Sequence, residues 1–230
     1  MGANLSLTFP DTLTGNAKPC LYIFGYGSLM WNPGFVFDHQ ERAMVRGYSR
    51  RFYQGNTTFR GTEDLPGRVV TLVGDESSHT YGIVFKVAGR RNVFDALEHL
   101  YEREIENGYT FQMVDVECVE TGQVWQALTC IAFEQNSWFL GAPVNAISSK
   151  YEKCGHDCQH EKENCHEFQL QRRMAMEIAM ARGRAGPNYE YLLKLTDSMR
   201  KFFPLVVDDH LYQLETYVLS FLKDSNHTIK

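Results

Sequence analysis

Two kinds of apolar pattern divide this chain into a strand-rich part followed by a helix-rich part. β-Branched and aromatic residues gather in short runs that predict strands. These runs are 20–24, 69–73, 81–87, 110–119 and 124–133. One helix, 91–106, is expected between them, because its apolar residues recur every three or four positions. Strands that come mainly first and helices that come mainly after predict an α+β fold.

Three more helices are expected after the last predicted strand. Residues 169–182 are rich in Met, Ala and Glu and are followed by Gly183, a common helix terminator. Pro187 can begin a helix that continues to Leu195. A last helix, 208–222, repeats apolar residues at helical spacing after Asp208, which can serve as its N-cap.

We expect one domain over residues 20–222. A chain of 230 residues buries a sizeable core without disulfide bonds. Residues 1–19 are rich in Pro, Gly, Thr and Asn, which predicts a flexible leader, and 223–230 remain as a tail. The first six residues also fit the pattern for N-myristoylation at Gly2, and a leader that carries no lipid is the alternative.

Charge and hydropathy exclude two classes of protein. The sequence has 23 Lys and Arg against 28 Asp and Glu, a net charge of −5, and the basic residues are not clustered. Duplex nucleic acid needs a basic binding face, so we expect no nucleic-acid partner. The sequence has no secretory signal pattern and no run of the ~18 apolar residues that cross a bilayer. We therefore expect no transmembrane segment and a cytoplasmic protein.

A polar and charged segment, 148–168, contains half of the six cysteines. Its composition differs from both flanks, which indicates an inserted surface segment. It offers more than the four soft ligands that a structural zinc ion needs, although the alternate spacing is not that of a C-x₂-C knuckle. A flexible insertion without metal is the alternative. The candidate ligands are Cys154, His156, Cys158, His160, Cys165 and His166.

The most informative stretch, 22–31, is a predicted strand that runs into a loop with two glycines, Gly25 and Gly27. Such a loop turns tightly and exposes backbone N–H groups to an anion. A dinucleotide fingerprint is excluded because Met30 stands where its third glycine belongs. A nucleophile elbow is excluded because Tyr26, not serine, lies between the glycines. A carboxylate or phosphate cradle and a plain turn at the end of a strand both remain open.

Charged residues elsewhere give weaker signals. Arg60 and Arg68 bracket a turn, and either could face a substrate carboxylate or remain solvated. Glu102, Glu104 and Glu106 alternate at the end of a predicted helix, so at most one or two of them can point inward.

Taken together, these residues resemble the ChaC family of γ-glutamylcyclotransferases, which degrade glutathione. The resemblance spans nearly all of 20–222, and its five motifs occur in the order of the family. They are FGYGSLMW (24–31), RGTEDLPGRVVTL (60–72), R-E-x-x-x-G-Y (103–109), FLGAP (139–143) and IAMARGRAGPNYEYLLKL (178–195).

The resemblance implies a γ-glutamylcyclotransferase-like fold, a small, mostly antiparallel β-barrel flanked by helices. It also implies a lyase reaction in which the α-amino group of glutathione attacks the side-chain amide carbonyl of its own γ-glutamyl unit. The products are 5-oxoproline and cysteinylglycine, and no cofactor is required. Glu104 would be the acid/base, and burial would have to raise its pKa toward that of the amine.

The resemblance further implies that backbone amides of the loop hold the γ-glutamyl group. Tyr109, Tyr189 and Tyr191 are candidate hydroxyl partners of the substrate. The candidate substrate-binding residues are Ile23, Phe24, Gly25, Tyr26, Gly27, Ser28, Leu29, Arg60, Tyr109 and Tyr191.

Two features of the chain depart from the family. Glu63 and Asp64 stand where the family usually has proline and glutamate, and the Cys/His segment has no counterpart in typical members. Two other functions stay open: a cyclotransferase for other γ-glutamyl peptides or amines, and a non-catalytic, metal-binding interaction protein on the same fold. The sequence leaves the oligomeric state undetermined.

Overall fold

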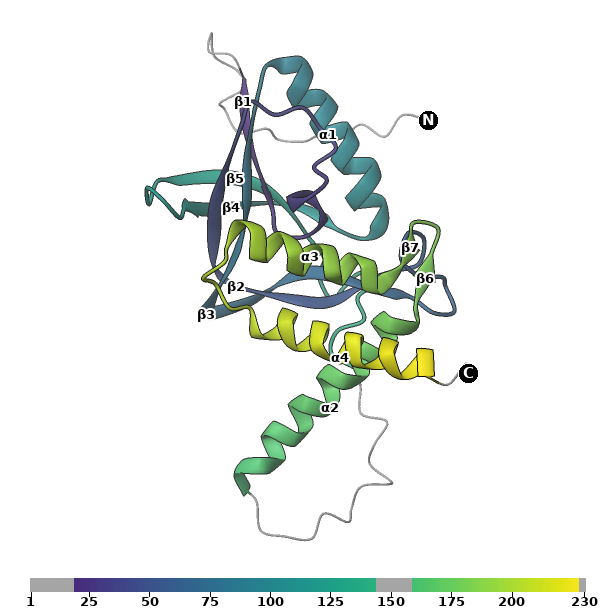
Figure 1. Ribbon diagram of the computed structural model, residues 1–230. Helices are drawn as coiled ribbons and strands as arrows, with labels where there is room; N and C mark the ends of the chain where they lie inside the picture. The colour runs from purple at the N-terminus through teal and green to yellow at the C-terminus, as the bar shows by residue number, and fades with distance from the viewer. Residues whose placement is uncertain (1–18, 144–158, 228–230) are drawn as a thin grey trace.

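A closed barrel of five strands forms the centre of the protein in a computed structural model (Figure 1). The structure describes the backbone of residues 19–143 and 159–227 and the side chains of 19–143 and 168–224. Around the barrel the strand order is β1-β3-β2-β4-β5. The strands are β1 (Cys20–Gly25), β2 (His39–Asn56), β3 (Gly67–Ala88), β4 (Thr110–Cys118) and β5 (Val124–Ile131).

The barrel is antiparallel except at one seam. β3 pairs antiparallel with β1 and β2, and β4 does so with β2 and β5. The pairing of β1 with β5 is parallel, through Ile23 and Leu128, and it closes the barrel. The predicted α+β fold with a mostly antiparallel barrel is therefore confirmed.

Two strands differ from the sequence prediction. β2 was not expected, because arginines interrupt its apolar residues, whereas Ala43 and Val45 on it are fully buried. The two runs expected at 69–73 and 81–87 belong to one long strand, β3. The polar stretch between them stays in the strand because β2 pairs with both ends of β3, with a register shift between Arg46 and Tyr48.

Four helices flank the barrel or pack on one another beside it (Figure 1): α1 (Arg90–Glu104), α2 (Gln159–Met180), α3 (Asn188–Phe202) and α4 (Asp209–His227). α1 packs on β1 and β3, while α4 packs against α2 and α3. α2 begins earlier than the expected residue 169, so the last part of the Cys/His segment is helical, and α4 extends beyond the expected end at 222. Within the described residues, no helix is long and apolar enough to cross a membrane.

A buried side-chain pairing fixes the start of α3 on the barrel. The Asn188 side chain accepts a hydrogen bond from the Arg68 N–H at 2.7 Å and donates one to the Arg68 carbonyl at 2.9 Å. Asn188 is fully buried, so this amide takes the place of a strand partner for the β3 backbone. The pairing sets the position of the first turn of α3.

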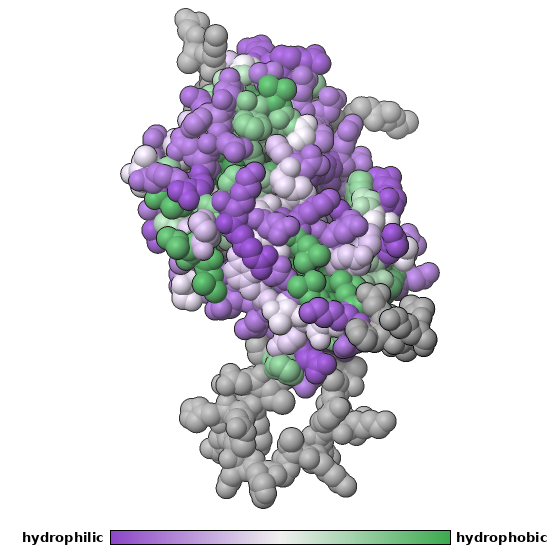
Figure 2. Space-filling model, viewed as in Figure 1, coloured by the Kyte–Doolittle hydropathy of each residue, from purple (hydrophilic) through white to green (hydrophobic). Residues whose placement is uncertain are grey.

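The apolar core fills the barrel and continues under the helices. Its largest fully buried side chains include Phe24, Phe52, Phe85, Leu100, Ile178 and Leu192. Figure 2 shows hydrophilic residues over most of one face, with apolar residues in separate patches. Scattered apolar residues of this kind are normal on a protein surface.

His210 makes the stability of the fold sensitive to pH. Its Nε2 accepts a hydrogen bond from the Phe52 N–H at 3.3 Å, and its Nδ1 lies 2.8 Å from the Gln171 amide. Burial, assisted by nearby arginines, lowers the pKa of His210 to about 3. Between this pKa and the ordinary value of about 6.5, the unfolded chain binds the proton more tightly than the folded protein does. The contribution of neutral His210 to the free energy of unfolding is therefore fully present above pH 6.5, and it is lost as the pH falls from about 6.5 toward 3.

We predict that the free energy of unfolding falls by about 2 kcal/mol between pH 7 and pH 5 through His210 alone. In His210→Gln, which does not titrate, urea unfolding should show a smaller loss over this range, although the variant starts from a lower stability at pH 7. His79→Gln, at an exposed site, controls for the removal of a surface histidine. An equal loss in His210→Gln and in the unaltered protein would contradict this account.

Candidate active site

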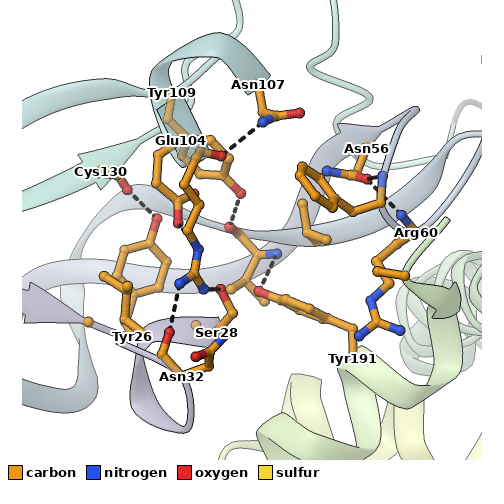
Figure 3. A pocket seen from close by; sticks show the side chains of 18 of the residues that line it. Tyr26, Ser28, Asn32, Asn56, Arg60, Glu104, Asn107, Tyr109, Cys130 and Tyr191 are labelled. Atoms are coloured by element: carbon orange, nitrogen blue, oxygen red, sulfur yellow. Dashed lines mark hydrogen bonds and ion pairs between the residues drawn. The ribbon is translucent and has the colours of Figure 1, made fainter. Parts of the chain in front are cut away.

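A cavity of about 640 Å³ lies where the ends of most elements meet. It is lined by the end of β1 and the loop after it, the end of α1 and the turn that follows it, parts of β3 and β5, the segment after β2, and α3. Figure 3 shows the side chains of Tyr26, Ser28, Glu104, Tyr109 and Tyr191 converging on this cavity. The cavity volume is typical of sites for small molecules, about 300–1,000 Å³.

Close packing requires glycine both at Gly25, the last residue of β1, and at Gly27, in the loop after it. A Cβ added to Gly25 would lie 2.6 Å from the Cβ of Leu29. One added to Gly27 would lie 2.8 Å from the Tyr191 hydroxyl and equally close to a methyl group of Val70. Any side chain at either position would push the loop away from its neighbours.

The loop continues into a single 3₁₀ turn, η2 (Ser28–Met30). The first hydrogen bond of the turn is donated by the Met30 N–H to the Gly27 carbonyl at 3.0 Å. The N–H groups of Ser28 and Leu29 precede this donor, so the turn does not use them. Ser28 and Leu29 both line the cavity, where such groups can bind a carboxylate.

Glu104, the last residue of α1, lies in the same cavity as this loop. Its side chain is 15% exposed. Burial raises the pKa of the Glu104 carboxyl, and the positive charge of Arg103 opposes part of this rise. The carboxyl group therefore holds a proton more tightly than a solvated glutamate does, while Arg103 keeps the ionised form accessible.

Arg103 connects the end of α1 to the loop after β1. Its guanidinium lies 3.1 Å from the Glu104 carboxylate. It also donates hydrogen bonds to the Ser28 hydroxyl and to the Asn32 carbonyl, both at 2.6 Å. A planar arginine fork holds three groups at once in a way that a lysine ammonium does not. The loop and the carboxylate are thus held in one arrangement.

The end of α1 places Glu104 and Tyr109 on the same cavity. A short 3₁₀ turn, η3 (Ile105–Asn107), follows the helix and ends at Gly108, whose φ is +87°. Glycine adopts this left-handed conformation without strain. The Tyr109 N–H then donates to the Glu104 carbonyl at 3.2 Å. Glu102 and Glu106, in contrast, are exposed at the rim of the cavity.

Three buried tyrosines line the cavity, and their hydroxyl groups differ in whether they can accept a hydrogen bond from a ligand or donate one to it. The Tyr26 hydroxyl donates to the Cys130 carbonyl at 2.6 Å, and the Tyr109 hydroxyl donates to the Val70 carbonyl at 2.7 Å. Each of these two oxygens can then only accept from a ligand. The Tyr191 hydroxyl accepts from the Val70 N–H at 3.5 Å and keeps its own proton for a ligand. Burial raises the pKa of all three tyrosines, which keeps them neutral.

The structure brings most of the predicted site residues together. Ile23 does not line the cavity, because it is buried in the core, and Tyr189 also packs against the core. Arg68 does not line it either, since its buried guanidinium pairs with Glu177 at 2.5 Å. The predicted residues that line the cavity are Phe24, Gly25, Tyr26, Gly27, Ser28, Leu29, Arg60, Glu104, Tyr109 and Tyr191.

The predicted zinc ligands cannot be placed in this site. Cys154, His156 and Cys158 lie outside the described residues. His160, Cys165 and His166 lie in α2, but their side chains are outside the described part of the structure. Among the side chains that are described, no group of three or more His, Cys, Asp or Glu could hold a metal ion. The zinc site therefore stays a prediction.

Sequence reasoning missed several lining residues. Arg103 precedes Glu104 in the quoted R-E motif, but nothing in the pattern indicated that its side chain reaches the loop. Arg184 lies in the quoted motif 178–195, and Asn56 ends the unexpected strand β2. Their positions depend on contacts between distant segments, which residue spacing does not encode.

The sequence matches the family described as ChaC-like protein over residues 21–158 and 153–221. The chain belongs to the ChaC-like family. One relative is 34% identical over 209 residues, which are 90% of this chain and 92% of the relative. It is named glutathione-specific γ-glutamylcyclotransferase 1 and comes from Danio rerio. A human protein of the same name is 38% identical over 194 residues, which are 83% of this chain and 75% of the relative.

A solved structure from yeast shares the fold of this ChaC-like protein. It is described as a γ-glutamyl cyclotransferase specific to glutathione and matches with a TM-score of 0.70. The sequences are 24% identical, and the match covers 88% of this chain and 96% of the yeast chain. The cyclotransferase-type fold that the sequence predicts is therefore confirmed.

We predict that Arg103→Gln raises the pKa of Glu104, because the substitution removes a positive charge that stabilises the buried carboxylate. Carbon-13 NMR of glutamate carboxyl groups measures this pKa, and the missing signal in Glu104→Gln assigns the resonance. Arg91→Gln, which changes an exposed arginine of the same helix paired with Asp95, is the matched control. A Glu104 pKa that stays the same in Arg103→Gln would show that the guanidinium does not tune the carboxyl group.

Proposed function

We propose that this chain is a γ-glutamylcyclotransferase that converts glutathione to 5-oxoproline and cysteinylglycine. The observation that carries the proposal is the buried Glu104 carboxyl in one cavity with the unused backbone donors of Ser28 and Leu29. The names of the relatives at 34–38% identity support glutathione as the substrate.

The cavity has complementary groups for both ends of an α-amino acid. The N–H groups of Ser28 and Leu29 suit the α-carboxylate of the γ-glutamyl unit. The Glu104 carboxylate and the hydroxyl oxygens of Tyr26 and Tyr109 are acceptors that suit its α-ammonium group. Binding at both points bends the flexible glutamyl chain, so that its nitrogen approaches its own side-chain carbonyl.

The reaction needs proton transfer at two points. The Glu104 carboxylate takes a proton from the α-ammonium, and the free amine attacks the γ-carbonyl carbon to form the new C–N bond of the lactam. Attack leaves a second excess proton on the attacking nitrogen, and Glu104 accepts this proton after it has released the first one to solvent. The carboxyl group then delivers its proton to the amide nitrogen of cysteine, the old C–N bond breaks as the carbonyl re-forms, and the released amine takes up a proton from solvent. Each proton that Glu104 accepts is returned, so the enzyme is unchanged after one turnover.

The raised pKa of Glu104 brings its proton affinity closer to that of the amine. An unperturbed glutamate has a pKa of about 4.3 and an α-amine one of about 8, so proton transfer to a solvated glutamate would be unfavourable. Burial reduces this difference. Because the attack is intramolecular, most of the rate gain comes from holding the reacting atoms together. The proposed mechanism uses no cofactor.

The expected absence of a nucleic-acid partner and the cytoplasmic location stay predictions from the sequence. Activity on other γ-glutamyl peptides or amines is the alternative within the same chemistry, and a direct comparison of substrates separates the two.

We predict that Glu104→Gln lowers kcat for 5-oxoproline formation by at least about 100-fold, because the amide keeps the shape and loses the acid/base group. The measurement is chromatographic detection of 5-oxoproline and cysteinylglycine from glutathione. Glu98→Gln, an exposed change on the same helix, is the matched control and should retain activity. Circular dichroism and thermal unfolding check that Glu104→Gln is folded.

Two results would refute the proposal. One is the absence of 5-oxoproline when the unaltered protein is incubated with glutathione, and the other is full activity in folded Glu104→Gln. Faster turnover of γ-glutamyl amino acids or amines than of glutathione would keep the reaction but reject glutathione as the preferred substrate.

A further inference from the structure

One wall of the cavity is formed by the segment that follows β2, and hydrogen bonds hold this segment in place. The Asn56 side chain accepts hydrogen bonds from the backbone N–H groups of Phe59 at 2.7 Å and Arg60 at 2.8 Å. Asn56 is buried, so these bonds fix the chain just after β2. Figure 3 shows Asn56 and Arg60 on the opposite side of the view from Glu104.

A two-stranded hairpin, β6 (Arg182–Gly183) and β7 (Gly186–Pro187), packs on this wall. The Arg184 N–H donates to the Thr58 carbonyl at 3.1 Å, and the Ala185 N–H donates to the Phe59 carbonyl at 2.9 Å. A Cβ added to Gly183 would lie within 2.6 Å of the Phe59 backbone, so glycine is required for the hairpin to approach. The hairpin backbone therefore has a fixed place on the wall.

Two arginines of this wall line the cavity, and their electrostatic states differ. The Arg60 guanidinium lies 3.1 Å from the Glu190 carboxylate and donates to the Pro187 carbonyl at 3.0 Å. Its charge is already compensated. The Arg184 guanidinium lies over the Phe59 ring, 4.1 Å from its centre. Among the residues that the structure describes, no carboxylate pairs with Arg184.

The contact with Phe59 prepares Arg184 to bind an anion. A guanidinium stacked on an aromatic face loses little further freedom on binding. The N–H groups at its edge stay available to form two parallel hydrogen bonds with a carboxylate. The arginine therefore offers a partly ordered and uncompensated positive charge at the cavity.

The carboxylates and the arginines of the cavity lie mostly on different segments. Glu102 and Glu104 lie at the end of α1 and Glu106 lies in η3, where Arg103 is paired with Glu104, whereas Arg60 and Arg184 come from the wall after β2 and its hairpin. Glutathione carries one ammonium group, on its γ-glutamyl unit, and a carboxylate at the far end of the peptide, on its glycine. With the ammonium at Glu104, the peptide extends away from α1, and its second carboxylate needs a positive partner.

Resting on the proposed function, we propose that Arg184 binds the C-terminal carboxylate of the peptide substrate. This contact selects γ-glutamyl peptides with a free C-terminal carboxylate over γ-glutamyl amines, which lack that group. Arg184 takes no part in proton transfer, because the reacting atoms are at the Glu104 end. Its contribution is to substrate binding and specificity.

Steady-state kinetics with two substrates tests this assignment. Arg184→Gln keeps a planar group near Phe59 and removes the charge, so we expect KM for glutathione to rise about tenfold with kcat nearly unchanged. The second substrate is glutathione esterified with ethanol at its glycine carboxylate. The unaltered enzyme should show a similar rise in KM for this ester, whereas Arg184→Gln should no longer distinguish the two substrates.

Arg182→Gln is the matched control, because Arg182 is an exposed arginine of the same hairpin and does not line the cavity. It should discriminate against the ester as strongly as the unaltered enzyme does. Calorimetric binding of glutathione to Glu104→Gln, with and without Arg184→Gln, gives a second measurement that needs no turnover, and the second substitution should weaken binding about tenfold.

The outcomes separate this proposal from the proposed function. If glutathione is turned over and Arg184→Gln discriminates against the ester as before, the Arg184 subsite is wrong and the cyclotransferase activity stands. Unchanged glutathione affinity in the calorimetric pair would also reject the subsite. If the unaltered protein binds glutathione and forms no 5-oxoproline, the proposed function fails, while weaker binding in the Arg184→Gln pair would still support the subsite.

Discussion

The contact of one guanidinium with two separate segments sets the geometry of the site. Arg103 belongs to α1, whereas Ser28 and Asn32 belong to the segment after β1, and the arginine joins them beside the Glu104 carboxylate. A buried carboxylate is costly unless it is paired, and a paired one is fixed in place. The same contact therefore lowers the cost of ionising Glu104 and holds the backbone donors of the loop at the cavity.

The contact of Arg103 with the loop depends on the barrel, because the barrel brings segments that are distant in the sequence together around one cavity. The loop follows directly from β1, and β3 contributes Val70 to the cavity wall. The hydrogen bonds between the Asn188 side chain and the Arg68 backbone fix the first turn of α3 and therefore the position of Tyr191. The Tyr191 hydroxyl in turn lies where a side chain at Gly27 would have to be. The close fit of loop, strand and helix explains why a cavity with so many polar groups keeps a defined shape.

The sequence predicts the strand-to-loop turn and four helices, because periodicity and glycine placement are local signals, whereas only the resemblance to the ChaC family singles out Glu104. The sequence does not predict β2, since arginines interrupt the apolar pattern of the strand, and among them Arg46 is exposed whereas Arg50 is buried. It also leaves the role of the arginines open. Arg68 is buried with Glu177, Arg60 is paired with Glu190, and Arg184 faces the cavity, and these differences depend on which segments the fold brings together.

The most direct test of the account is a crystal structure of Glu104→Gln with glutathione bound. The account predicts that the α-ammonium lies within hydrogen-bond distance of the residue 104 side chain and the α-carboxylate lies against the N–H groups of Ser28 and Leu29. The γ-carbonyl carbon should then lie within about 3.5 Å of the amine nitrogen. A peptide bound in the reverse direction, with its γ-glutamyl end at Arg184, or bound outside this cavity, would contradict the account.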